Sequence, residues 1–555
     1  AIQPTASAEI ANFYGSYNTH KHSLKFSTGK INDRFELSGR FSVIKSDGYR
    51  DRGWSNLKSY FLQGAYAYGG TLIKAILLGG KQHAYLTYLG LDKATLANDR
   101  RYNPAGEYTD AAGNKRFYDN ESDNYQQDLA QLHWSQQWNE FWRTQIAFHY
   151  TKGKGYWENY EKGAYSWIGL PSLGNDPDGE EKQAYYIHQQ GLNNDFWGTT
   201  FSANYKKDNI DLLVGGALNR YQGAHIKDLL WAEKAYTSYK NNYSYEGLNT
   251  KEEASGFAKL TYTLNSKWSL FADMQLRYVN YEAKKYKVNE ALYNFNPKMG
   301  VTFNLNPNNS FYLSYARATK EPNRSDYKDY AKELKKNALA KKPVAEKLND
   351  FELGWRYQSD KVVLNVNGYY MGYQDQLIPT GKLNETGYPI RENVGSSYRS
   401  GIEADATVHL STKWIWQPNV AFSKNITKDY KTEKKKVITY WGDTQISYSP
   451  SAVIGNTISF LPIKNFQASL ISKYVGSQYI DNTQREEAKL DAYFVNNLSL
   501  QYEWTPKHTF KSVLFSVIGN NILNAKYTPY GSNKYGESYI PAAEAHYLAG
   551  ITLSF

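Results

Sequence analysis

The sequence predicts an all-β protein whose 555 residues form one transmembrane antiparallel β-barrel of about 22 strands. Three observations predict this fold. Apolar and polar residues alternate with a period of two along most of the chain, long apolar runs are missing, and short turns alternate with long connections. Because no linker divides the chain, we expect 1–555 to be a single domain.

The alternation extends from the first part of the chain to its last residue. In 35–43 the odd-numbered positions are apolar or glycine and the even-numbered ones are polar, and in 350–358 the odd-numbered positions are again apolar. In 363–372 the even-numbered positions from 364 to 370 are apolar or glycine, opposite two asparagines, and in 498–504 the even-numbered positions are apolar and the odd-numbered ones polar. Many such segments reach about ten residues, enough to cross a bilayer obliquely, whereas strands of a soluble sandwich have about five or six. The polar positions are expected to face a wet interior, among them Glu352, Arg356, Asn365, Asn367, Gln501 and Glu503.

The connections separate two ends of the predicted barrel. Short turns rich in Gly, Asn, Asp, Ser and Pro include 206–209, 306–309 and 358–361. Between successive short turns we expect one long connection each time, at 90–123, 152–195, 223–251, 319–346, 377–394, 427–447 and 525–541. Short periplasmic turns and long extracellular loops are typical of outer-membrane barrels.

The chain ends on a strand, HYLAGITLSF, whose last residue is the aromatic Phe555. Apolar residues occupy Tyr547, Ala549, Ile551 and Leu553 on one side of it. In a soluble sheet this strand would form an exposed edge, but a closed barrel pairs it with the first strand, near 8–16.

Composition excludes several other classes. The most apolar stretches, such as 71–80, are far shorter than the roughly 20 residues of a membrane-spanning helix. The absence of cysteine excludes disulfides, thiolate metal sites and cysteine nucleophiles. The net charge of +11 is spread among acidic and tyrosine-rich segments, which argues against nucleic-acid binding. No repeat of about 40–50 residues indicates a β-propeller.

Catalytic and metal-binding patterns are also missing from the sequence. It contains neither a nucleophile elbow nor a zinc motif, so we assign no catalytic residue, metal ligand or cofactor and expect no enzyme. His83, His133, His149 and His546 fall in expected strands, where a polar role facing the interior is favoured over haem or metal ligation.

Taken together, these segments resemble the TonB-dependent transporters of Gram-negative outer membranes. The stretch 9–29 resembles the first barrel hairpin of that family, 517–527 its penultimate strand, and 547–555 its last strand, whose final aromatic residue, here Phe555, serves as the assembly signal. The stretch 314–327, SYARATKEPNRSDY, is similar to a strand-to-loop passage of many iron-complex receptors. The N-terminal plug domain and TonB box of the family are not in this chain.

The resemblance implies TonB-dependent active import of a scarce nutrient across the outer membrane, with a ferric siderophore as the expected substrate. Haem, cobalamin and oligosaccharides are the alternatives within the family, and a passive porin or an outer-membrane enzyme is the alternative from another class. The implied partners are the TonB-ExbB-ExbD complex, contacted through the missing N-terminal region, outer-membrane lipids, the small-molecule substrate and a surface lipoprotein. Nucleic acid is not among them.

Three segments supply candidate substrate-binding residues. They are Tyr156, Trp157, Tyr160 and Trp167 from the expected loop 155–167, His225 and Trp231 from 225–245, and Arg317, Lys320 and Arg324 from the segment after 316. Aromatic rings beside cations suit planar or anionic ligands such as ferric catecholates. The alternatives are membrane-girdle residues and loop packing for the aromatic segments, and a solvated charge run with a short helix at 329–342 for the third.

Overall fold

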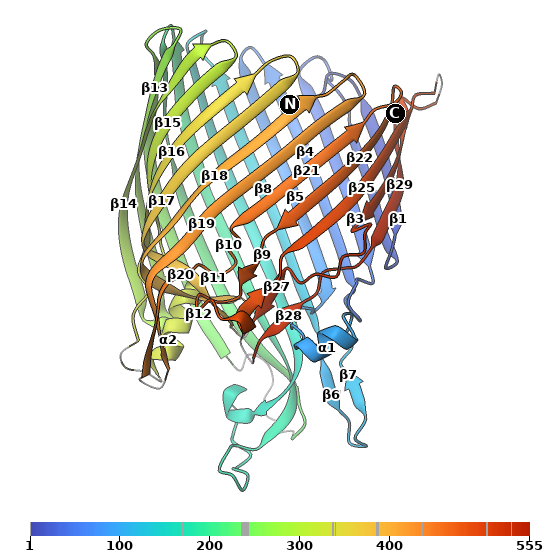
Figure 1. Cartoon of the computed structure of the whole chain (residues 1–555), viewed down its shortest axis with the longest axis vertical. Coiled ribbons are helices and arrows are strands. Elements are labelled where there is room, and N and C mark those ends of the chain that lie inside the picture. Colours follow the sequence, from blue (N-terminus) through green and yellow to red (C-terminus); the bar gives the residue numbers. More distant parts are fainter. Residues whose placement is uncertain are drawn as a thin grey trace.

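The computed structural model describes residues 2–555 apart from Gly169, 235–243, 336–337, 339, 385–387, 435–436, 507–508 and 534–535. Its main sheet contains 23 strands, of which β20 pairs only with β19. The remaining 22 strands form a closed antiparallel wall, as the alternation predicts (Figure 1). None of the helices in the described ranges is long and apolar enough to cross a membrane.

The first half of the wall contains β1 (Ser7–Gly15), β2 (Thr19–Ser27), β3 (Phe35–Ser46), β4 (Ser55–Tyr68), β5 (Thr71–Tyr85), β8 (Ser122–Gln137), β9 (Trp142–Ala164), β10 (Gln183–Lys207), β11 (Ile210–Ala232), β12 (Ser244–Thr263) and β13 (Trp268–Ala283). The second half contains β14 (Val288–Asn306), β15 (Asn309–Lys320), β16 (Glu346–Gln358), β17 (Val362–Leu383), β18 (Pro389–His409), β19 (Trp414–Lys434), β21 (Ala452–Phe460), β22 (Phe466–Val475), β25 (Tyr493–Trp504), β26 (Ser512–Asn520) and β29 (His546–Ser554).

Smaller elements lie in the connections. They are α1 (Lys93–Asn98), β6 (Glu107–Thr109), β7 (Lys115–Phe117), η1 (Tyr165–Ile168), η2 (Lys284–Tyr286), α2 (Arg324–Leu334), β20 (Val437–Gln445), β23 (Gln478–Tyr479), η3 (Glu486–Ala488), β24 (Lys489–Leu490), β27 (Tyr530–Ser532) and β28 (Ser538–Ile540). In Figure 1 these elements lie at the lower end of the barrel, and both chain ends lie near the upper end.

The wall closes between the last strand and the first. β29 pairs with β26 on one side and with β1 on the other, where Ile10 is opposite Leu553. The Phe555 amide donates a hydrogen bond of 2.8 Å to the Ala8 carbonyl. The pairing expected for the terminal strand is therefore present, and it leaves no open edge.

The two faces of the wall differ as the period of two predicts. Large apolar side chains project outward and stay exposed, for example Leu77, Phe148, Leu276 and Leu353. Polar residues alternate with them on the inner face. We say that a strand residue has inward or outward parity when its place in this alternation puts it on the inner or the outer face. The six positions expected to face the interior have the inward parity. Among the histidines, His133, His149 and His546 share that parity, whereas His83 lies on the outer face beside Trp54, so the expectation was wrong for His83.

The short turns lie where the sequence places them, but the long connections differ from the expectation. Much of 152–195 is strand, because β9 continues to Ala164 and β10 begins at Gln183. β11 and β17 likewise extend into 223–251 and 377–394. The reason is that strand pairing continues past the membrane and satisfies the backbone groups there.

Two connections at the long-loop end are short. β1 and β2 are joined by residues 16–18, and β13 and β14 by a segment that contains only η2 and its flanking Lys287. The expectation of one long connection between every pair of short turns was therefore wrong. Length at this end is concentrated in the connections after β5, β9, β15, β19, β22 and β26.

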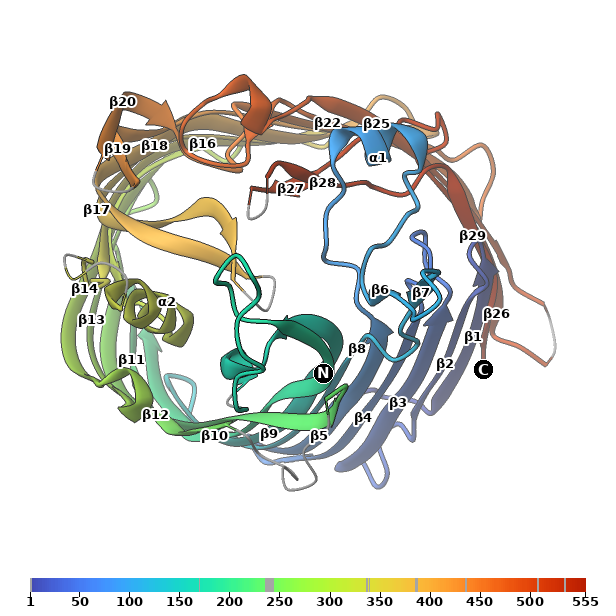
Figure 2. The ribbon, with the colours of Figure 1, turned by 90° about the horizontal axis from the view of Figure 1, so that it is seen from below.

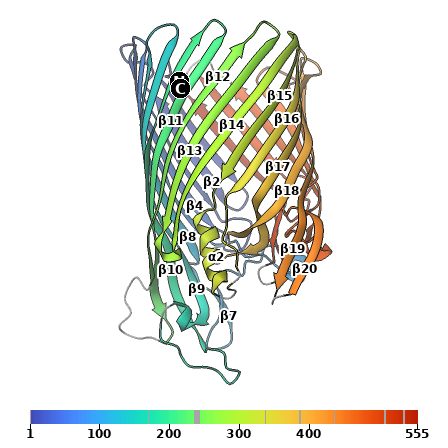
Figure 3. The same ribbon diagram turned by 90° about the vertical axis from the view of Figure 1, so that its left-hand side faces the viewer.

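The long connections turn inward over the barrel opening. Seen along the barrel from the long-loop end, α2, the hairpin between β17 and β18, and the connection after β9 lie inside the ring of strands (Figure 2). The side view shows α2 at the level of the strand ends, enclosed by the wall, and not beyond them (Figure 3). Small apolar clusters hold connections at this end together. One consists of Ile480, Ala488, Leu490 and Tyr539, and it joins the connections after β22 and β26.

This topology predicts where trypsin cuts intact cells. Lys115, in the exposed β6–β7 hairpin at the long-loop end, should be cleaved rapidly because long loops face the exterior. Lys361 is equally exposed but lies in a short turn at the opposite end, so it should be cut only after the cells are opened. Mapping the fragments by mass spectrometry tests both sites, and cleavage at Lys361 in intact cells would reverse the orientation.

Candidate functional site

The helix α2 lies at the long-loop end of the barrel interior and is held there by polar contacts (Figure 2). It begins after Asn323, whose side chain accepts a hydrogen bond of 3.1 Å from the Asp326 amide. The Asp326 carboxylate in turn accepts one of 2.7 Å from the Asn323 amide. This capping box satisfies two amides that a helix start leaves without partners. It also starts the helix at Arg324, five residues before the predicted start at 329.

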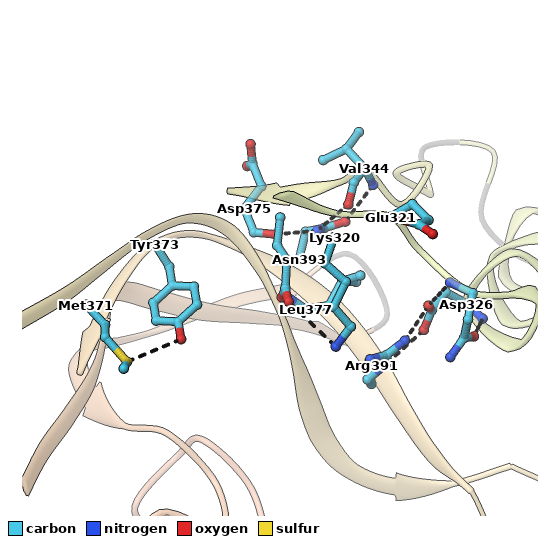
Figure 4. A network of polar contacts seen from close by, with 12 residues as sticks. Lys320, Glu321, Asp326, Val344, Met371, Tyr373, Asp375, Leu377, Arg391 and Asn393 are labelled. Carbon is cyan, nitrogen blue, oxygen red and sulfur yellow. Dashed lines mark hydrogen bonds and ion pairs between the residues drawn. The ribbon is translucent and has the colours of Figure 1, made fainter. Parts of the chain in front are cut away.

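The same carboxylate attaches α2 to the wall. Arg391 of β18 donates to Asp326 through Nε at 3.0 Å and through Nη2 at 2.6 Å (Figure 4). Asp326 is buried and Arg391 nearly so, which means that the pair lies largely out of water. Losing either partner would leave a buried charge without compensation.

A second set of contacts holds the β17–β18 hairpin against the segment before β16. The Asn393 side-chain amide donates to the carbonyls of Val344 and Asp375, at 3.0 and 2.6 Å, and its oxygen accepts from the Val344 amide at 2.9 Å (Figure 4). Glu346 accepts from the Leu377 amide at 2.9 Å. These contacts hold the hairpin where it projects into the opening.

A network of four charged residues joins the wall to the segment that leads into α2. Arg277 of β13 makes paired hydrogen bonds with Glu253 of β12, at 3.0 and 2.9 Å, and with Glu321, at 2.8 and 3.0 Å. Lys251 completes the network through Glu321. Burial alone would raise the pKa of Glu321, but the bonds from Arg277 and Lys251 outweigh it and lower the pKa to about 2. Glu321 therefore stays ionised, and the network fixes the segment that leads into α2.

Cations and aromatic rings gather beside this network. The guanidinium of Arg324 lies 5.5 Å from the Tyr286 ring, and its Nη2 donates to the Tyr286 hydroxyl at 3.2 Å. Burial lowers the pKa of Arg324 to about 10, which still leaves it protonated at neutral pH. Arg324 also acts electrostatically on Tyr221 and His225 of β11. We call Tyr221, His225, Tyr286 and Arg324 the inner site.

Further groups surround the inner site. Lys285 and Lys328 act electrostatically on His225 together with Arg324, and Tyr125 of β8 is close enough to Tyr221 to influence it. Protonated amines, a guanidinium and phenol rings on one inner surface can bind an anionic, aromatic ligand through charge attraction, hydrogen bonds and stacking.

The candidate residues of the expected loop 155–167 lie on different faces of the wall. Tyr156 and Tyr160 of β9 share the outward parity, whereas Trp157 points inward and packs edge-on against His188, with ring centroids 5.3 Å apart. Trp167 lies on η1 and is 67% exposed. The expected loop 155–167 is mostly strand, so its aromatic residues do not form one site.

Two candidates meet on the outer face instead. Tyr160 stacks on Tyr185, with centroids 5.0 Å apart, and on Trp231 at 6.0 Å. Tyr108 and Tyr118 from the connection after β5 join the same group. Within 225–245, His225 belongs to the inner site, while residues 235–243 with Tyr236, Tyr239, Lys240 and Tyr243 lie outside the described residues.

The charged candidates also divide between the faces. Arg324 belongs to the inner site, and Lys320 has the inward parity and forms an ion pair of 3.7 Å with Glu346. Arg317 has the outward parity, in line with Leu313 and Tyr315 on β15, so it does not line the opening from within. The sequence interpretation did not select Tyr125, Tyr221, Tyr286, Arg277 or Arg391. For those that lie on strands, the alternation of apolar and polar residues would have indicated that they are on the inner face.

Removing the Asp326 carboxylate should release α2. Asp326→Ala takes away one side of the capping box and the partner of Arg391, a loss of about 3 kcal/mol or more for a buried pair. Amides of α2 should then exchange hydrogen on the order of 100-fold faster, as measured by mass spectrometry. Glu333→Ala, an exposed position of the same helix, is the control and should leave exchange unchanged. Unaltered exchange in Asp326→Ala would show that the pair does not hold the helix.

Comparisons with known proteins agree with this architecture. The family model for "TonB dependent receptor-like, beta-barrel" matches residues 74–522. The pesticin receptor of Yersinia enterocolitica is 24% identical over 195 residues, covering 35% of this chain and 26% of that protein, and that of Yersinia pestis is 24% identical over 199 residues with the same coverage. The matched part thus spans well under two thirds of the length of these curated relatives.

Solved structures match along the whole chain. The ferric citrate transporter FecA, in its unliganded form, has a TM-score of 0.75 at 14% identity, covering 100% of this chain and 79% of that one. The copper transporter OprC has a TM-score of 0.74 at 13% identity, with 100% and 83% covered. The ferric yersiniabactin uptake receptor FyuA from Yersinia pestis has a TM-score of 0.70 at 15% identity, with 100% and 81% covered. At these identities the likeness concerns the fold.

The family model matches the chain from within β5 to just past the end of β26, which is most of the wall. The strands outside the match complete the closed barrel of 22 strands. The chain belongs to the TonB-dependent receptor-like β-barrel family, whose members lie in the outer membrane, and its barrel spans that membrane.

Proposed function

We propose that the protein imports a ferric siderophore of the catecholate type by TonB-dependent active transport. The observation that carries the proposal is the inner site, where Arg324 lies against the Tyr286 ring and acts together with Lys285 and Lys328 on His225. A ferric catecholate complex is anionic and bears aromatic rings, so it can use charge attraction and stacking at once. Family membership supports energy-coupled transport through TonB-ExbB-ExbD.

The similar folds do not select the substrate. FecA and FyuA are named for ferric complexes, but OprC is named for copper. The preference for a catecholate therefore depends on the side chains of the inner site. Haem, cobalamin and oligosaccharides remain the competing substrates, and a surface lipoprotein that delivers substrate is part of the proposal.

Uptake by iron-limited cells tests this function. Cells that lack their own receptors and express the full-length protein should accumulate radiolabelled iron from a ferric tricatecholate, and a protonophore should stop the accumulation. Arg324→Gln should reduce the uptake rate at least about tenfold, because a tenfold change corresponds to the binding free energy of about one charge-assisted hydrogen bond. Arg317→Gln removes the same charge from the outer face and should leave uptake unchanged.

Two results would overturn the proposal. Uptake that continues with the protonophore indicates a passive pore. Accumulation of haem or cobalamin, but not of the catecholate, assigns another substrate to the same family. Heat-modifiable migration of each variant on gels confirms that its barrel is folded, so a loss of uptake in Arg324→Gln can be attributed to the site.

A further inference from the structure

A groove of about 620 Å³ crosses the outer face of the wall from β1 to β8. Its floor is apolar and includes Ile10, Leu24 and Phe41, which are opposite one another on three successive strands. Lys58 and Lys81 line its edge. The groove has no part in the inner site, because its apolar floor and its two lysines have the parity of the outward-facing Leu62 and Leu77.

The two lysines lie side by side without a carboxylate partner. Lys58 of β4 is directly opposite Lys81 of β5, an arrangement of like charges that destabilises a strand pair. Among the described residues neither makes an ion pair, whereas Lys152, further along the wall, pairs with Asp195 at 2.9 Å. Asp128 also lines the groove, but its oxygens accept hydrogen bonds from Tyr60 at 2.9 Å and from Gln126 at 2.8 Å.

Their height on the wall places these lysines at a membrane surface. Outward positions of β4 from Tyr68 to Tyr60 are tyrosine, leucine or glycine, and those of β5 from Ile73 to Gly79 are apolar or glycine. Lys58 and Lys81 are the first charged outward residues beyond this band, on the side of the long loops. An apolar band about 25 Å tall is what a barrel presents to lipid, so the two amines are at the level of the head groups.

We propose that this groove binds a phosphate-bearing lipid of the leaflet on the long-loop side. The phosphate lies between Lys58 and Lys81 and neutralises their mutual repulsion, and an acyl chain lies along Leu24 and Phe41. A free anion would leave the apolar floor uncovered, and a protein partner would have to enter the lipid. The combination of a cationic edge with an apolar floor inside the lipid boundary favours the lipid.

Native mass spectrometry of the detergent-solubilised protein tests the proposal. The probes are lipid A with two phosphates, the same lipid without phosphates, and inorganic phosphate. Wild type should retain the phosphorylated lipid, and the double variant Lys58→Gln, Lys81→Gln should bind it about 25-fold more weakly, from about fivefold per lysine. Lys58→Arg, Lys81→Arg should retain binding, which separates loss of charge from misfolding.

Lys74→Gln is the matched control. Lys74 lies on β5 as Lys81 does but has the inward parity, so its loss should not alter lipid binding. Equal binding of the dephosphorylated lipid, an equal loss in Lys74→Gln, or complete displacement of the lipid by inorganic phosphate would each overturn the proposal. The test is independent of transport, because it requires neither a substrate nor an energy source.

Discussion

Phe555→Asp should prevent barrel assembly and leave almost no heat-modifiable protein in the outer membrane. Phe555 lies at the end of the strand that closes the wall, its amide bonds to Ala8, and its ring packs edge-on against Phe510 with centroids 5.2 Å apart. An aspartate would remove the aromatic signal that the family resemblance assigns to this position and place a charge at the membrane interface, at a cost of up to about 1 kcal/mol. The expected loss is of the assembled protein rather than of transport alone.

Gel migration of outer-membrane fractions with and without heating measures this result. Phe555→Tyr keeps an aromatic ring at the same place and should assemble normally. If Phe555→Asp reached wild-type amounts of folded barrel, the role of the last residue in assembly would be refuted.

Residues 1–555 alone should conduct ions when inserted into a planar bilayer. The inner face carries polar and charged side chains such as Glu352, Arg356 and Gln501, which need water or another polar surface against them. A barrel of 22 strands is too wide for its own side chains to fill. We therefore expect large, weakly selective conductance steps.

The comparison is with the same barrel preceded by a family plug domain, which should be nearly silent. Equal and small conductances from both proteins would mean that the inward-folded connections, including α2 and the β17–β18 hairpin, already close the interior. In that case the polar inner face would be covered by loops instead of water.

The wall could be predicted from the sequence because alternate residues of a strand face opposite sides, so apolar and polar residues alternate along it. The alternation at 350–358 identified both the lipid face and the polar face of β16 before any pairing was known. The same counting places Arg317 with Leu313 on the outer face and Trp157 opposite Tyr156. The choice of Arg317 and Tyr156 as site residues was weak because it used proximity in sequence and ignored parity.

The polar contacts around α2 could be predicted only in part. The capping box from Asn323 to Asp326 is a local signal, and it indicates where α2 begins. The pairing of Asp326 with Arg391, 65 positions away, and of Glu321 with Arg277, 44 positions away, depends on how the connections fold inward. No local pattern encodes that, so Arg277 and Arg391 were not selected.

Closure of the wall between β1 and β29 also bears on the order of folding. Most neighbouring strands of the wall follow one another along the chain through short or moderate connections, but Ile10 and Leu553 are separated by 543 positions (553 − 10). Loop-closure entropy opposes such a contact until the intervening strands are paired, so we infer that this joint forms last. It is also tightly packed, because a Cβ on Gly550 would lie 2.3 Å from the Phe13 ring and one on Gly15 2.3 Å from the Tyr547 carbonyl. Until it forms, the open sheet has two free edges, at β1 and β29. The longer the sheet stays open, the more time these edges have to pair with other chains.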